Sequence, residues 1–164
     1  MKRFLLLLLL LTTYGHINAQ RYKEIIKWEV PTKSGGLLFG ISHNKGEAKY
    51  IIEDFKRRNK KTKYDITNYQ PVYMFSTIKV KNYSDDPVKI FKNITNNKGY
   101  KVFGKEDLDA LNLLNRSNLI TAANQYANTK KVSLDYAINR ITQIKNLYTD
   151  YRILSKYYNS ISRL

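Results

Sequence analysis

No glycine or proline occurs in residues 105–164, whereas the seven glycines and three prolines of the chain all lie at or before Gly104. These two residue types interrupt helices more strongly than any others. Residues 105–164 are therefore free to form long helices, while turns concentrate in the preceding part. We expect a basic α+β region over residues 20–104 and a helical region over 105–164, continuous with each other and joined at Gly104.

The first part of the helical region has apolar residues at helical spacing. Three acidic residues, Glu106, Asp107 and Asp109, come first and suit the positive end of a helix dipole. The stripe that follows consists of Leu108, Leu111, Leu114, Leu119, Ala122, Ala123 and Tyr126. This pattern predicts one helix that ends near Asn128.

A second and longer stripe follows Ser133, a residue type that caps helices well. Its members are Leu134, Ile138, Ile141, Ile144, Tyr148, Tyr151, Leu154, Tyr158 and Ile161. A helix over Ser133–Ser162 would be roughly 45 Å long. That is longer than a small domain is wide, so we expect part of it to pack on another chain. The interface residues would be Ile144, Tyr148, Tyr151, Leu154 and Tyr158.

The region before Gly104 alternates between strand-like and helical patterns. The predicted strands are Glu24–Val30, Leu37–Ile41, Val72–Val80 and Tyr100–Phe103. The predicted helices run from about Gly46 to Arg58 and from about Ser84, with Pro87 in the first turn. The fold class is therefore α+β: a small N-terminal β/α half followed by a C-terminal helical hairpin with a long terminal helix.

The N-terminus has the three parts of a secretory signal peptide. Lys2 and Arg3 are basic, Phe4–Leu11 is apolar, and Ala19 is a small residue suited to a cleavage site. The apolar run is much shorter than the ~20 residues that span a bilayer. We expect residues 1–19 to be removed and the mature protein to be secreted or periplasmic.

The residue inventory excludes several kinds of chemistry. The chain has no cysteine and two histidines, so disulfides, thiol nucleophiles and cysteine-ligated metals are excluded. No nucleophile-elbow, zinc-protease or EF-hand pattern occurs. We expect no cofactor and no metal site.

The chain is strongly basic, with 29 Lys and Arg against 13 Asp and Glu. Six cations fall in eight positions beside Phe55 and Tyr64, and Tyr69 follows. The predicted binding residues are Lys56, Arg57, Arg58, Lys60, Lys61, Lys63 and Tyr64. Such a run could neutralise phosphates of nucleic acid or of an anionic lipid surface, or bind another anionic polymer. Two alternatives are a solvated loop and a lysine excess that reflects A/T-rich codons.

Two further segments suggest ligand chemistry. His43 and Glu47 lie between a predicted strand and a predicted helix, where His43 could act as a general base oriented by Glu47, with Lys45 or Lys49 holding an anion. The turn Thr32–Gly36 has backbone freedom that could cradle a phosphate, although it lacks P-loop spacing. For both segments the favoured explanation is a plain turn without a ligand: a solvated turn at His43 and a hairpin turn at Thr32–Gly36.

The leading hypothesis is an exported, non-enzymatic binding protein. Its basic part would contact an anionic surface or polymer, and its terminal helix would bind a protein partner or a second copy of the chain. The alternative is a small secreted phosphodiesterase or nuclease-like hydrolase that uses His43. A membrane-active terminal helix is disfavoured because that helix is only mildly basic.

Overall fold

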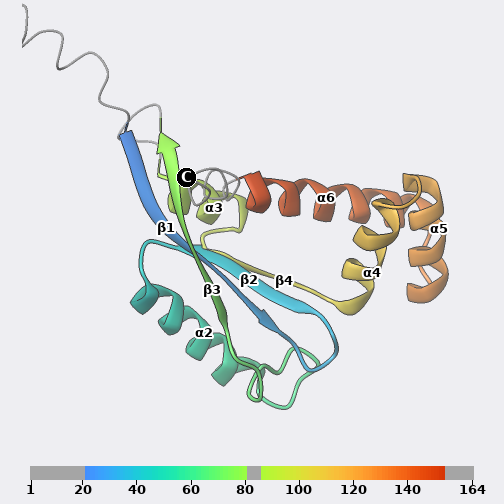
Figure 1. Cartoon of the computed structure of the whole chain (residues 1–164). Coiled ribbons are helices and arrows are strands. Elements are labelled where there is room, and N and C mark those ends of the chain that lie inside the picture. Colours follow the sequence, from blue (N-terminus) through green and yellow to red (C-terminus); the bar gives the residue numbers. More distant parts are fainter. Residues whose placement is uncertain (1–20, 81–85, 154–164) are drawn as a thin grey trace, which may run out of the picture.

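A four-stranded antiparallel sheet organises the first half of the molecule (Figure 1). The computed structural model describes residues 21–80 and 86–153. The strands are β1 (Arg21–Pro31), β2 (Leu37–Ser42), β3 (Val72–Val80) and β4 (Tyr100–Phe103), in the spatial order β3-β1-β2-β4. The predicted α+β class is confirmed, and each predicted strand is present.

β1 and β2 form an antiparallel hairpin, in which a glycine of β2 leaves room for a tryptophan of β1. Trp28 of β1 lies opposite Gly40 of β2. A Cβ atom on Gly40 would lie 2.3 Å from Cζ2 of Trp28 and 2.6 Å from the carbonyl oxygen of Gly99. Only glycine fits this position, because the fully buried indole occupies the space of a side chain.

Helices cover both faces of the sheet, because side chains alternate between faces along each strand. Helix α2 (Lys45–Asn59) covers one face and α3 (Pro87–Ile94) and α6 (Leu134–Ile153) cover the other (Figure 1). The core on the α2 side contains Ile26, Trp28, Val30, Leu38, Ala48, Ile52, Phe55 and Ile66. The core on the α6 side contains Ile25, Phe39, Ile41, Val88, Phe91, Phe103, Leu111, Ile144, Leu147 and Tyr151.

The helical region differs from the prediction in one respect: its first helix is divided. α4 (Lys105–Leu114) and α5 (Leu119–Lys130) are separate helices. The break has a local cause, because Oγ of Ser117 donates to the carbonyl of Leu113 at 2.8 Å. The Asn118 side chain then accepts from the amide of Thr121 at 2.9 Å and so caps α5.

Helix α6 connects the sheet to α4 and α5. Ile141 packs with residues of α4 and α5, whereas Ile144 and Tyr151 pack against the sheet. An ion pair adds to this junction, since the Arg140 guanidinium donates to both carboxylate oxygens of the buried Asp107, at 2.6 and 3.1 Å. Tyr126 of α5 donates its hydroxyl hydrogen to the same carboxylate at 3.2 Å.

The prediction that Ile144, Tyr148 and Tyr151 contact another chain is corrected by their burial within this one. Ile144 and Tyr151 are each 1% exposed, and Tyr148 is half-buried against the same core. Their stripe is covered by the molecule's own sheet, which the length of the helix alone did not reveal. Leu154, Tyr158, the expected signal peptide and the residues just before Asp86 lie outside the described residues.

Within residues 21–80 and 86–153, no helix combines the length and the apolar character that crossing a membrane requires.

Candidate functional site

The predicted basic run divides into two structurally different parts. Lys56, Arg57 and Arg58 lie in the last turn of α2, where they pair with acids of the same helix. Arg57 donates to Asp54 at 2.7 Å, and Arg58 also contacts Asp54 and donates to the Tyr100 hydroxyl at 3.3 Å. The remaining cations, Lys60, Lys61 and Lys63, are exposed on the loop that follows.

This loop has a defined backbone. The Asp65 carboxylate accepts hydrogen bonds from the amide of Lys61 and from both the amide and the hydroxyl of Thr67. These hydrogen bonds lower the pKa of Asp65 to about 2. The loop therefore holds its exposed lysines on a fixed framework.

The turn at Thr32–Gly36 has no amide left for a phosphate. Its five amides donate, in order, to Gly36 O, Asp65 O, Lys63 O, Thr32 O and Thr32 Oγ1. The turn thus binds the neighbouring loop of residues 60–70, as Figure 1 also shows. The structure does not support the suggested phosphate cradle.

An open groove lies between α2 and the segment leading into β3. It has a volume of about 580 Å³. Lys45, Lys49 and Lys56 line it from α2, and Tyr69 and Tyr73 line it from the loop and β3. The three lysines recur at intervals of four and seven residues, so they lie along one stripe of the helix. The groove therefore combines a wall of cations with tyrosine rings.

Contacts across the groove connect its two walls. Nζ of Lys45 lies 5.0 Å from the centre of the Tyr73 ring, a cation–π distance. Burial and the nearby charge of Glu53 raise the pKa of Tyr73 above its ordinary value. Among the residues that the structure describes, Glu53 is the one acid that lines the groove, and its carboxylate lies 3.7 Å from Nζ of Lys56. The lysines thus leave the groove with an excess of positive charge.

A second hollow continues the groove past Lys45. It has a volume of about 440 Å³ and is lined by residues that include Lys45, His43 and Phe75. The Phe75 side chain is 57% exposed, which is unusual for so large an apolar residue on a strand. Phe75 and Tyr73 lie two positions apart on β3 and face the same side of the sheet. Aromatic rings therefore accompany the lysines over both hollows.

His43 lies between two carboxylates at the end of the second hollow. Its Nδ1 is 3.1 Å from Oε2 of Glu47, and its Nε2 is 2.8 Å from Oδ2 of Asp86. Lys92 donates to the other oxygen of Glu47 at 2.8 Å. The cluster connects the N-terminus of α2 with α3, because Glu47 and Lys92 come from these two helices.

The carboxylates of this cluster are held in their charged form. Burial alone would raise the pKa of Glu47, but hydrogen bonds from Lys92 and His43 outweigh it and hold this pKa below its ordinary value. Burial would also raise the pKa of Asp86. Hydrogen bonds from His43 and from the amide of Val88 outweigh this effect, so the pKa of Asp86 is below its ordinary value as well.

This geometry brings together His43 and Glu47, as predicted, but commits both ring nitrogens. Each nitrogen lies within hydrogen-bonding distance of a carboxylate, so a substrate would have to displace Glu47 or Asp86 before it could exchange a proton with the ring. The two carboxylates also lie on opposite sides of the ring, so they cannot share one ion with it. In the described ranges, no group of three or more His, Asp or Glu side chains is placed to hold a metal.

Sequence reasoning missed Tyr73 and Phe75, and it considered Lys45 and Lys49 only as possible anion holders beside His43. The helical spacing of Lys45, Lys49 and Lys56 was a visible signal, but the dense run further along the chain outweighed it. The predicted Tyr64 is only partly available, since its ring packs against the core beside α2 and Nζ of Lys63 lies 5.0 Å from its centre.

Comparison of the chain with protein family models, with curated proteins and with solved structures finds no match.

Proposed function

We propose that this chain is an exported, non-enzymatic binding protein that holds an anionic polymer along the groove between α2 and β3. The observation that carries the proposal is the groove itself, with Lys45, Lys49 and Lys56 on one wall and Tyr69 and Tyr73 on the other. Export rests on the signal-like N-terminal sequence, which places the polymer outside the cytoplasm.

The two kinds of side chain have complementary roles. Each lysine can neutralise an anionic group of the polymer and release its counterion, which makes binding depend on salt. The tyrosine rings, and Phe75 beyond them, offer flat faces on which bases or sugar rings can stack. A repeating anionic chain with flat rings would use both walls at once.

The loop cations Lys60, Lys61 and Lys63 form a less suitable site. They are exposed, and the ring beside Lys63, that of Tyr64, is packed into the core on one side. They can attract an anionic polymer over a distance, but they are not one wall of a groove whose second wall would orient the polymer. The groove is therefore the specific contact in this proposal.

Two variants with equal charge loss separate the groove from the loop. One carries Lys45→Gln, Lys49→Gln and Lys56→Gln, and the other carries Lys60→Gln, Lys61→Gln and Lys63→Gln. The probe is a single-stranded DNA of about 10 nucleotides, a typical length for an aromatic-lined groove. Affinity measured at two salt concentrations should fall by about tenfold or more in the groove variant, with a shallower salt dependence. The loop variant should lose clearly less.

A ring substitution tests stacking separately. Tyr69→Ala should weaken DNA binding by about 1 to 3 kcal/mol if a base stacks on this ring. Tyr50→Ala is the matched control, because Tyr50 is 75% exposed on α2 and does not line the groove. Equal losses in the groove and loop variants, together with no effect of Tyr69→Ala, would show that attraction is only general and would refute the proposal.

A further inference from the structure

The outer edge of β4 has no strand beside it in the described part of the chain. β4 pairs with β2 on one side and is the last strand of the sheet. Such an edge presents unpaired backbone donors and acceptors, which can pair with another extended segment.

The ladder between β2 and β4 identifies the free groups. The amide of Ile41 donates to the carbonyl of Gly99 at 3.4 Å, which makes this pair a hydrogen-bonded one. Hydrogen-bonded pairs alternate in an antiparallel ladder. Lys101 and Phe103 therefore bond to β2, and Tyr100 and Val102 direct their N–H and C=O groups to the outer edge.

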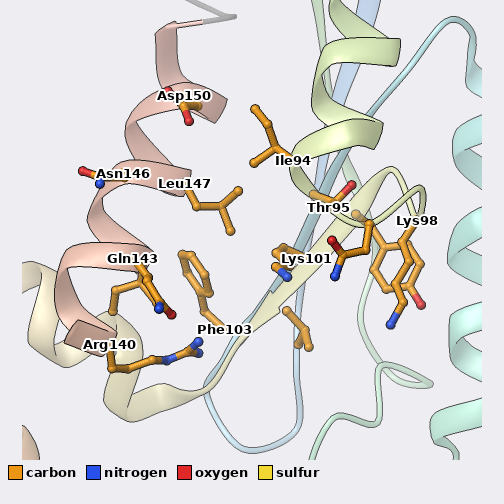
Figure 2. Close-up of a pocket in the computed structure, with 14 residues that line it drawn as sticks. Ile94, Thr95, Lys98, Lys101, Phe103, Arg140, Gln143, Asn146, Leu147 and Asp150 are labelled. Atoms are coloured by element: carbon orange, nitrogen blue, oxygen red, sulfur yellow. The ribbon is translucent and has the colours of Figure 1, made fainter. Parts of the chain in front are cut away.

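This edge faces an open space of about 530 Å³ between β4 and α6, which we call the β4–α6 groove (Figure 2). Tyr100 and Val102 line it although their side chains pack in the core beside α2, so their backbone is the part that borders the space. Leu147 and Phe103 form an apolar part of its wall, and Ile94, which is 38% exposed, lies at one end. An edge strand facing a helix across a partly apolar groove suits the addition of a peptide strand.

The turn before β4 has a defined structure and closes one end of the β4–α6 groove. Asn96, Asn97 and Gly99 all have positive φ angles. The Thr95 hydroxyl accepts from the amide of Gly99 at 3.0 Å and donates to the carbonyl of Phe91 at 2.7 Å. These bonds hold the turn in place, so the groove exists without a ligand and needs little ordering on binding.

The charges around the groove define its occupant. Lys98 and Lys101 have no ion pair within residues 21–80 and 86–153. Arg140 is already paired with Asp107, and Asp150 is an acid at the α6 wall. We propose that an extended acidic segment of a partner protein binds here and adds to β4 as a fifth strand, with its acids beside Lys98 and Lys101.

A second copy of this chain is a poor occupant of the same groove. Pairing the β4 edges of two copies would bring the lysines of one copy, Lys98 and Lys101, close to the lysines of the other. Like charges opposite each other in a sheet are destabilising. An acidic segment turns the same lysines into favourable contacts, so the charge distribution favours a different partner.

The test selects peptides on the full chain and then blocks the groove. A phage-displayed library of random octapeptides is the probe. Gln143→Trp and Asn146→Trp, made separately, place a large ring in the groove from the exposed side of α6. Thr142→Trp is the matched control, because Thr142 is exposed on the same helix but does not line the groove. Circular dichroism checks that each variant is folded.

We expect selection to enrich acidic peptides with β-forming residues, and both blocking variants to weaken their binding by about tenfold, a clear change in affinity. Thr142→Trp should leave binding unchanged. The enriched peptide should also slow hydrogen exchange at the amides of Tyr100 and Val102, whereas the amide of Lys101, already bonded to β2, should change little.

Three results would overturn the proposal. One is a selection that yields no acidic peptides. Another is binding that persists in both blocking variants, which would place the peptides on a surface other than the β4 edge. The third is equal binding by a peptide N-methylated at alternate amides in either register, because strand addition requires these donors.

Discussion

At the scale of one residue, Lys27 shows the effect of a sheet that is covered on both faces, because even a lysine side chain of this sheet is buried. It lies in the middle of β1 and is 5% exposed, with Nζ 3.9 Å from the centre of the Tyr151 ring. Burial lowers its pKa to about 8, and the charge of Glu29 opposes this only in part. Its ammonium form is therefore disfavoured in the folded protein relative to the unfolded chain.

We predict that Lys27→Met stabilises the protein at neutral pH. Between about pH 8 and 10.5 the unfolded chain holds a proton that folded Lys27 has lost, so the stability of the wild type rises with pH in this window. Below about pH 8 the buried charge of Lys27 lowers the free energy of unfolding by up to about 3 kcal/mol, and the contact with the Tyr151 ring offsets part of this loss. Denaturant unfolding at pH 7 and pH 10 should show a stability gain that shrinks at the higher pH.

Lys145→Met is the control, because Lys145 is exposed on α6. A Lys27→Met variant that is less stable than the wild type at pH 7, by the same margin at both pH values, would mean that the cation–π contact outweighs burial.

The burial of Lys27 could not be predicted from its own segment. Lys27 and Glu29 alternate with apolar residues, which predicts a strand with one solvated face. The structure covers that face with α6, whose Tyr151 also donates its hydroxyl hydrogen to Glu29 at 3.0 Å. A contact between residues this far apart in the chain leaves no signal in the local pattern.

At the scale of elements, local patterns located most helices and strands. The strand Val72–Val80 is as predicted, and the helix predicted from about Ser84 begins at Pro87, because turn residues and apolar periodicity delimit both elements. The division between α4 and α5 was missed, although the step from Leu114 to Leu119 breaks the helical spacing and Asn118 is a good cap. The lack of glycine and proline concealed this break.

The burial of α6 leads to a second prediction. Ile144→Ala should lower the free energy of unfolding by about 3 kcal/mol, since it removes a core side chain and leaves a cavity. Thr142→Ala, an exposed change on the same helix, should have little effect. Light scattering should give the same mass for both variants and the wild type. A wild-type dimer that dissociates on Ile144→Ala would instead restore the original interface hypothesis.

At the scale of the whole molecule, the candidate site depends on how distant segments meet. Lys45 and Tyr73 lie in α2 and β3, and a loop tied to the β1–β2 turn brings them together. The sequence showed that the chain is basic and where cations are densest. It could not show that the lysines of α2 face aromatic rings, because this depends on the packing of α2 against the sheet.

The most direct test of the α2–β3 groove is to locate the bound polymer residue by residue. Amide chemical shifts of the isotope-labelled protein would be followed during titration with the same single-stranded DNA. We expect the largest changes at Lys45, Lys49, Tyr69 and Tyr73, with saturation at a single affinity. Changes confined to Lys60–Lys63, or spread evenly over lysines on every face, would contradict a polymer-binding groove between α2 and β3.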